Sequence, residues 1–238
     1  MKNFFTIIGG MGTEATETFV HILNERTHAT NDQEYLNYIL VNHSTVPDRT
    51  DYILDHSKPN PFTPLAEDIQ QQSALNPDFF AIPCNTAHYF YDDLQNLTDI
   101  PILNMPKETV AAIKDYAPNA KRVGLIATKG TLHDKIYDNE ITNAGYELVK
   151  PTEKIADQTM SLIYDDIKAK NYVDESLYHL ILSQMVENLK CDIVILGCTE
   201  LSVAQQRACN HDYPVIDAQT VLADKCIELA KNNRDKNK

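Results

Sequence analysis

Short apolar runs alternate with longer amphipathic stretches along almost the whole chain. Short runs rich in Val, Ile and aromatic residues, bounded by turn-forming residues, are typical of buried strands. Such runs predict strands at Phe4 to Ile8, Tyr38 to Val41, Phe79 to Ile82, Val123 to Ala127, Ile193 to Leu196 and Val215 to Ile216. Because these runs are nearly continuously apolar and are separated by helical stretches, they indicate parallel sheets covered by helices on both faces.

Two of the intervening stretches show helical spacing clearly. In "TPLAEDIQQQSAL" (residues 63–75), Leu65 and Ile69 recur on one face. The stretch "MPKETVAAIKDYA" (residues 105–117) carries a proline in its first turn, where a missing N–H is tolerated, and then Val110 and Ile113 on one face. Strand and helix alternation therefore predicts an α/β fold.

A weak internal repeat divides the chain into two similar halves. "FFTIIGGMGTEAT" resembles "RVGLIATKGTLHD", and each ends its apolar run in a turn that contains Gly-Thr. Two cysteines, Cys84 and Cys198, likewise end apolar runs and precede polar pairs in the two halves. We expect two lobes, each a parallel-sheet Rossmann-like α/β unit. Residues 1–103 plus 213–238 form the first lobe with Cys84, and residues 104–212 form the second with Cys198.

The positions of Cys84 and Cys198 suggest acid/base chemistry. Ligands of open parallel sheets bind beyond the carboxyl ends of the strands, so a cleft between the lobes can bring both thiols face to face. A cysteine at a helix N-terminus is expected to favour thiolate, and a neutral thiol opposite it can donate a proton. Two such groups, with sulfurs roughly 7 Å apart around one carbon, can invert a stereocentre.

A buried cysteine is more often a small packing residue, and we assign that role to Cys191, Cys209 and Cys226. The cysteine count is odd and the chain has no C-x-x-C pair, which argues against a disulfide framework or a structural zinc site. The matched sequence contexts of Cys84 and Cys198 distinguish that pair from the other three.

Charge excludes some partners. Lys and Arg number 21 against 34 Asp and Glu, for a formal net charge of -13, so nucleic acid and anionic membranes would be repelled. The first apolar run is too short for a signal peptide, and no run reaches transmembrane length, so we expect a cytoplasmic protein. The chain has neither a Walker-type loop nor an H-E-x-x-H motif, so no cofactor or metal is expected.

The motifs "GGMGT", "NHSTVPDRT", "PCNTAH" and "GCTEL" together resemble the aspartate/glutamate racemase family over essentially the whole chain. The resemblance is closest to the aspartate racemase branch, because the glutamate racemase branch typically carries Asp-Ser-Gly where this chain reads Gly-Gly-Met-Gly. It implies two lobes related by pseudo-two-fold symmetry, an active site between them, a homodimer and no pyridoxal phosphate. It also implies that Cys84 and Cys198 interconvert L- and D-aspartate, or glutamate, as the two acid/base residues.

An anionic amino-acid substrate needs local positive charge in a protein of this composition. Arg49 can hold a carboxylate bidentately, with Asp48 beside it. Lys168 lies where similar aspartate racemases carry a substrate-binding lysine, although Lys170 is a nearby alternative. Arg49 and Lys168 together would favour a substrate with a side-chain carboxylate.

Further binding residues are expected at the ends of the strands. Polar groups directly after the two cysteines can bind the carboxylate or the ammonium group of the substrate, although Asn and Thr are also ordinary helix caps. The predicted substrate-binding residues are Met11, Gly12, Arg49, Asn85, Thr86, Thr128, Lys168, Thr199 and Glu200. We expect His88 to support Cys84 or to pack rather than to react.

Two alternatives stay open at this stage. A related racemase or isomerase, such as a hydantoin or malonate-type enzyme, could use the same scaffold with another substrate. A two-lobed amino-acid-binding protein without catalysis could also share the fold, but binding alone gives no reason for paired thiols.

Overall fold

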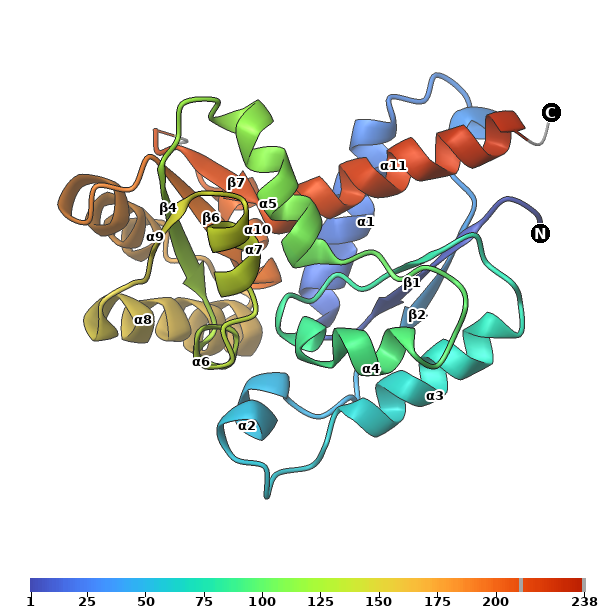
Figure 1. The fold of residues 1–238 in the computed structure, drawn as a ribbon, viewed down its shortest axis with the longest axis horizontal. Helices are drawn as coiled ribbons and strands as arrows, with labels where there is room; N and C mark the ends of the chain where they lie inside the picture. The colour runs from blue at the N-terminus through green and yellow to red at the C-terminus, as the bar shows by residue number, and fades with distance from the viewer. Residues whose placement is uncertain (210–211, 237–238) are drawn as a thin grey trace.

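The computed structural model describes residues 1–209 and 212–236. It contains two parallel sheets, each with helices packed around it (Figure 1). The strand order is β2-β1-β3 in the first sheet and β5-β4-β6-β7 in the second. The predicted α/β fold with two parallel-sheet lobes is therefore confirmed.

The first lobe is built around the shorter sheet. Its strands are β1 (Phe5–Gly9), β2 (Tyr38–Asn42) and β3 (Phe80–Ala81). Its helices are α1 (Thr13–Thr27), α2 (Arg49–Leu54), α3 (Phe62–Ser73) and α4 (Tyr91–Gln95), with 3₁₀ turns at Asp32–Glu34 and Thr86–Phe90.

The second lobe holds the longer sheet. Its strands are β4 (Arg122–Ala127), β5 (Glu147–Val149), β6 (Ile193–Gly197) and β7 (Val215–Asp217). Around it lie α6 (Lys129–His133), α7 (Asp138–Asn143), α8 (Glu153–Met160), α9 (Glu175–Ser183) and α10 (Thr199–Arg207). Two π-helical segments, Ser161–Lys168 and Gln184–Asn188, continue α8 and α9. At the junction of the lobes lie α5 (Met105–Tyr116) and α11 (Ala218–Lys236).

The strands predicted from the apolar runs all occur, with small shifts at their ends. The predicted helices at residues 63–75 and 105–117 correspond to α3 and α5. Only β5 was missed, because this three-residue edge strand exposes Glu147 and half-buries Leu148, and so lacks a continuous apolar run.

The internal repeat has a structural counterpart. In each sheet the first strand of the lobe, β1 or β4, lies between the second and the third. An isolated parallel bridge from Phe80 to Ile102 occupies the position that β7 holds beside β6 in the second sheet. The two lobes thus share one strand order, which explains why similar sequences follow β1 and β4.

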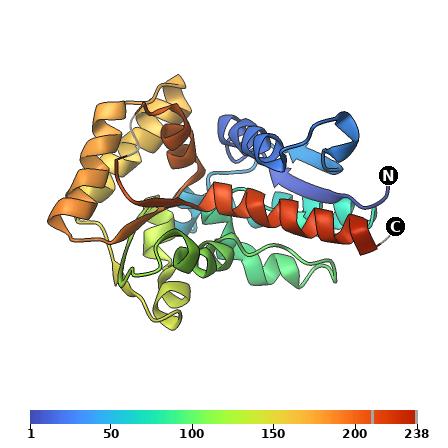
Figure 2. The ribbon, with the colours of Figure 1, turned by 90° about the horizontal axis from the view of Figure 1, so that it is seen from above.

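The chain crosses between the lobes twice. After β7, which pairs with β6 in the second sheet, α11 returns to the first lobe (Figures 1 and 2). There Leu222 and Cys226 share a core with Phe5 and Phe19. The proposed lobe limits stay a prediction, with residues 210–211 and 237–238 outside the described part of the chain. None of the described helices is long and apolar enough to cross a membrane.

The lobes approach each other closely where α2 meets α6. A Cβ added to Gly130 on α6 would lie 2.9 Å from the Cα of Thr50 on α2 and 3.0 Å from its Oγ1. Because the nearest of these atoms belongs to the backbone, it cannot rotate away. Gly130 therefore permits a contact between the lobes that a larger residue would obstruct.

We predict that Gly130→Ala destabilises the protein by about 1–3 kcal/mol, the usual cost of forcing extra volume into a packed contact. Urea denaturation followed by circular dichroism measures the change. An unchanged or increased free energy of unfolding would show that the contact between α2 and α6 accommodates the added methyl group without strain.

Candidate active site

Cys84 and Cys198 line one cavity between the lobes. Cys84 comes from the loop after β3 and Cys198 from the end of β6. The wall of this inner cavity consists of Met11, Asp48, Arg49, Thr50, Cys84, Asn85, Thr86, Thr128, Tyr164, Lys168, Cys198, Thr199 and Glu200. It contains every predicted site residue except Gly12, which lines an adjoining outer pocket. The structure thus brings the predicted residues together, while their roles in binding or catalysis stay predictions.

The inner cavity is nearly closed. About 10 Å³ of it is open to the centre of a water molecule, which is about the space of one water. The outer pocket measures about 410 Å³ in the same way. The two share a wall formed by Met11, Asp48, Arg49, Lys168 and Glu200. A ligand of amino-acid size can therefore reach the thiols only if this wall moves.

The two cysteines occupy equivalent positions in the two lobes. Cys84 follows β3 and is 4% exposed, while Cys198 follows β6 and is 5% exposed. The helices after them differ, because Cys198 is the N-cap of α10 whereas a five-residue 3₁₀ turn, Thr86–Phe90, follows Cys84. The thiols share a cavity because β3 and β6 end at the same place between the lobes.

The thiol of Cys198 is held by a carboxylate. Its Sγ–H donates to Oε2 of Glu200 at 2.9 Å. Burial raises the pKa of Cys198 well above its usual range, the negative charge of Glu200 raises it further, and Lys168 only partly opposes them. The sequence leaves open which cysteine is the thiolate. For Cys198, desolvation and the adjacent carboxylate outweigh the helix start and favour the neutral thiol.

Arg49 is a buried cation, and among the described residues no carboxylate binds its guanidinium in a bidentate way. Its Nη2 donates to the carbonyl of Met11 at 2.9 Å, and its Nη1 donates to the carbonyl of Pro47 at 3.0 Å. Burial alone lowers the pKa of Arg49, but interactions with the nearby acidic groups Cys84, Asp48 and Glu200 outweigh it and raise the pKa. The guanidinium thus stays charged next to Cys84.

Lys168 closes the cavity from the second lobe. Its Nζ lies 3.6 Å from Oδ2 of Asp48, 3.8 Å from Oε1 of Glu200 and 4.3 Å from the ring centroid of Tyr164. Burial alone lowers the pKa of Lys168, yet Glu200 and Tyr164 outweigh it and raise the pKa. The Tyr164 hydroxyl lies 3.1 Å from each carboxylate oxygen of Asp48. Charged contacts between Asp48 and Lys168 therefore join the lobes over the thiols.

Two threonines of the cavity wall, Thr86 and Thr128, meet the hydroxyl of a third, Thr131. Thr86 from the first lobe lies 3.1 Å from Thr128 and 3.0 Å from Thr131 of the second, measured between the hydroxyl oxygens. Thr128 also caps α6 by accepting the backbone N–H of Thr131. Each hydroxyl can donate one hydrogen bond, so the cluster can exchange internal bonds for bonds to a ligand oxygen.

Two donors on the cavity wall have no partner among the described residues. These are Nε of Arg49 and Nδ2 of Asn85, both buried. A buried donor without an acceptor costs about 1–3 kcal/mol, so such groups in a native structure call for an acceptor. Because both residues line the inner cavity, an anion bound there could satisfy the two donors together.

His88 supports the backbone at Cys84. Its Nε2 accepts the backbone N–H of Met105 at 3.1 Å, so Nδ1 carries the proton and donates to the carbonyl of Cys84 at 2.9 Å. Burial lowers the pKa of His88, which keeps the ring neutral. This contact is with the backbone and not with the thiol, in agreement with the supporting role expected for His88.

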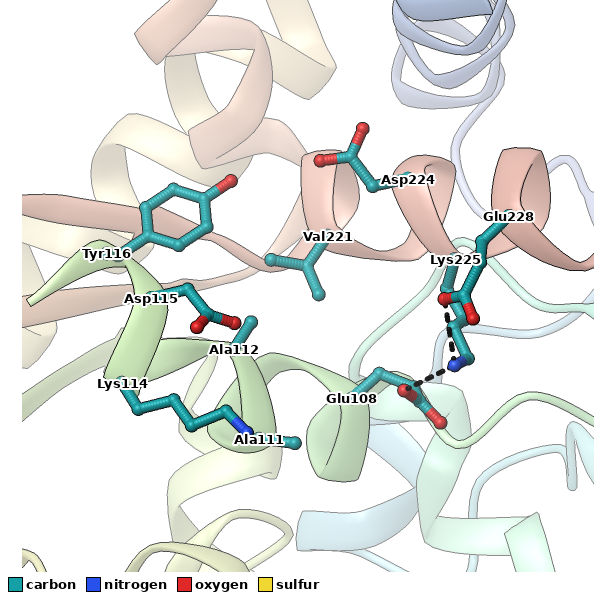
Figure 3. A pocket seen from close by; sticks show the side chains of 10 residues that line it. All are labelled: Glu108, Ala111, Ala112, Lys114, Asp115, Tyr116, Val221, Asp224, Lys225 and Glu228. Carbon is teal, nitrogen blue, oxygen red and sulfur yellow. Dashed lines mark hydrogen bonds and ion pairs between the residues drawn. The ribbon is translucent and has the colours of Figure 1, made fainter. Parts of the chain in front are cut away.

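A separate pocket, of about 460 Å³, lies away from the inner cavity and the outer pocket, between α5 and α11 at the junction of the lobes (Figure 3). Lys225 lies there between Glu108 and Glu228, at 3.9 and 3.1 Å (Figure 3). The pocket contains neither of the two cysteines at the strand ends and none of the predicted binding residues. The candidate active site is therefore the inner cavity.

The sequence interpretation missed Thr50 and Tyr164 on the cavity wall. Tyr164 lies four residues before Lys168 in one helical segment, so their helical spacing could have revealed it. Thr50 follows Arg49 directly but gave no signal of its own.

The chain is similar to known racemases over almost its whole length. The family model for Asp/Glu/Hydantoin racemase matches residues 8–226 of this chain. The broad specificity amino-acid racemase RacX of Bacillus subtilis (strain 168) is 25% identical over 227 residues, covering 93% of this chain and 95% of RacX.

Solved structures share the whole fold. The aspartate racemase of Picrophilus torridus superimposes with a TM-score of 0.81 and 26% identity, over 97% of both chains. The glutamate racemase of Francisella tularensis, in complex with D-glutamate, gives a TM-score of 0.67 at 17% identity. That comparison covers 97% of this chain and 81% of the other, and it establishes a common fold.

We predict that Glu200→Gln lowers the pKa of Cys198, because it removes the negative charge that opposes ionisation of the thiol. The thiolate is titrated by its ultraviolet absorbance, with Cys198→Ser subtracted as the reference. A pKa that is unchanged or higher in the Gln variant would contradict the electrostatic role given to Glu200.

Proposed function

This chain belongs to the Asp/Glu/Hydantoin racemase family, and we propose that it interconverts L- and D-aspartate by two-base proton transfer between Cys84 and Cys198. The observation that carries the proposal is the meeting of these two thiols, one from each lobe, in a single buried cavity. The similarity to RacX and to the aspartate racemase of Picrophilus torridus supports amino-acid racemisation as the activity.

The proposed reaction moves one proton in and one proton out at the substrate Cα. A thiolate removes the Cα hydrogen from one face and becomes a thiol. The opposite thiol donates its proton to the other face and becomes a thiolate. The carbon is inverted and the protonation states of the two cysteines are exchanged, so exchange of protons with solvent must restore them before another molecule of the same enantiomer reacts. No bond of the substrate other than Cα–H breaks.

The surroundings of the two sulfurs give them different resting states in this proposal. Cys198 starts as the proton donor, because burial and Glu200 hold it as a thiol. Cys84 is then assigned as the base, because Cys198 is the donor and the guanidinium of Arg49 lines the same cavity. Oε2 of Glu200 accepts the Cys198 thiol proton, and Oε1 of the same carboxylate lies 3.8 Å from Nζ of Lys168.

Substrate binding would use the donors that lack partners. We assign Nδ2 of Asn85 and Nε of Arg49 to carboxylate oxygens, because both are buried, unpaired and on the cavity wall. Lys168 would release Asp48 and pair with the side-chain carboxylate. The hydroxyls of Thr86 and Thr128 would donate to the α-carboxylate. The charge that develops there as the Cα proton leaves is then stabilised by fixed donors in a water-poor site.

Entry of the substrate requires the lobes to part, because the closed cavity has room for about one water. The contacts of Lys168 with Asp48 and of Tyr164 with Asp48 cross between the lobes and must break first. An anionic substrate can compete with Asp48 for Lys168. Its carboxylate would then replace Asp48 as the ion-pair partner of Lys168 and would favour opening of the lobes.

We predict that Cys84→Ala and Cys198→Ala each lose racemisation of aspartate by about 10²- to 10⁴-fold, the usual contribution of a general acid or base. The assay is chiral chromatography of L- and D-aspartate without added cofactor. Cys191→Ala is the matched control, since Cys191 is also buried but lies away from the cavity. Substantial turnover by either active-site variant would break the two-base assignment.

We predict that Lys168→Met raises the KM for aspartate by about 10- to 100-fold, the size expected for losing a hydrogen bond to a charged group. Lys170→Met is the matched control, because Lys170 is exposed and paired with Asp166 at 2.9 Å. Equal effects of the two substitutions would remove Lys168 from substrate binding.

A panel of amino-acid substrates distinguishes an aspartate racemase from the alternative functions. Activity with aspartate and glutamate alone fits the two cations at the cavity, whereas equal activity with apolar amino acids would indicate a broader racemase of the same family. Binding of an amino acid without inversion would indicate the non-catalytic alternative. The homodimer implied by the resemblance stays a prediction.

A further inference from the structure

A buried tyrosine reaches across the lobe boundary to the polar residue beside Cys84. Tyr137 precedes α7 in the second lobe, and its side chain is fully buried in a core with Val110 and Leu125. Its hydroxyl donates a short hydrogen bond to Oδ1 of Asn85 in the first lobe. Tyr137 does not line the inner cavity, whereas Asn85 does. The phenol therefore acts on the cavity only through this amide.

The hydrogen bond determines which end of the Asn85 amide is available. Because Oδ1 accepts from Tyr137, the amide nitrogen Nδ2 is left without a partner on the cavity wall. If the amide turned over, its carbonyl oxygen would occupy that position and would repel a carboxylate. An apolar residue at position 137 would leave both orientations open, since neither end of the amide would then be fixed.

We infer that Tyr137 is a positioning residue that fixes the Asn85 amide from the opposite lobe, with Nδ2 presented to a carboxylate in the inner cavity. The inference rests on the proposed function, because it assigns the Asn85 donor to the carboxylate of an amino-acid substrate. The bond crosses from one lobe to the other, so the amide is fixed in this way only while the lobes are together. Closure of the lobes then completes the carboxylate site.

Burial supports this role for the phenol. Desolvation raises the pKa of Tyr137, so the hydroxyl keeps its proton and acts as a donor throughout the usual pH range. The neighbouring Thr109 hydroxyl donates to the carbonyl of Met105 at 2.7 Å. Its proton is thus engaged elsewhere, and Tyr137 supplies the donor to Asn85.

The test compares two buried tyrosines of the second lobe. Tyr178 is also fully buried, and its hydroxyl donates to an amide oxygen, Oε1 of Gln205, at 2.5 Å. That pair lies outside the inner cavity. Tyr137→Phe and Tyr178→Phe therefore remove the same group from similar surroundings, and only the first touches the Asn85 amide.

We expect Tyr137→Phe to weaken binding of L-aspartate by about tenfold, as for loss of one well-placed hydrogen bond to a charged group, while Tyr178→Phe leaves it unchanged. Isothermal titration measures the affinity. In an Asn85→Ala background, Tyr137→Phe should change the affinity by less than about twofold, because two residues that act through one contact are not additive. Equal effects of the two tyrosine variants, or full additivity with Asn85→Ala, would overturn the inference.

A second readout keeps the inference separate from the proposed function. The side-chain amide of Asn85 is followed by NMR in the unliganded, ¹⁵N-labelled protein. We expect one sharp pair of resonances in the wild type and in Tyr178→Phe, and broadened or doubled resonances in Tyr137→Phe. If no variant binds aspartate, the proposed substrate is wrong, but the amide resonances still decide whether Tyr137 fixes Asn85. Unaltered resonances in Tyr137→Phe would refute it.

Discussion

The structure depends on holding two thiols from separate lobes in one nearly closed cavity, which has room for about one water. Each cysteine ends a strand in its own parallel sheet, and the shared strand order directs both strand ends to the same gap. The sheets cannot supply the remaining polar groups, so loops and helix starts of both lobes converge on the gap. The resulting site exists as a whole only when the lobes are together.

Although the protein is strongly acidic overall, the cavity wall carries positive as well as negative side chains. Two cations, Arg49 and Lys168, stand on the cavity wall against two carboxylates, Asp48 and Glu200. Desolvation would disfavour each charge alone, but the opposite charges nearby keep both cations protonated. Asp48 joins the lobes through Lys168, and Glu200 accepts the thiol proton of Cys198. Within the described part of the chain, the guanidinium of Arg49 therefore has no bidentate acidic partner.

Sequence reasoning predicted the parts of the fold that depend on local pattern. Continuous apolar runs located the strands, and the position of each cysteine at a strand end indicated that the two thiols meet in one cavity. The same reasoning missed β5, whose three residues lack an apolar run. It left open which cysteine is ionised, because burial and the contact with Glu200, which raise the pKa of Cys198, are properties of the folded structure. It had no means of finding Tyr137, whose contact with Asn85 joins residues 52 apart in the chain.

The central claim is that one sulfur acts on each face of a single carbon. The most direct test incubates the wild-type protein with L-aspartate in deuterated water and samples the reaction early. Mass spectrometry of the separated enantiomers measures deuterium at Cα in each. The account predicts deuterium in newly formed D-aspartate while the remaining L-aspartate keeps its original hydrogen, because the donor and the acceptor are different thiols. Equal deuterium in both enantiomers from the start would contradict it, since a single base would then serve both faces.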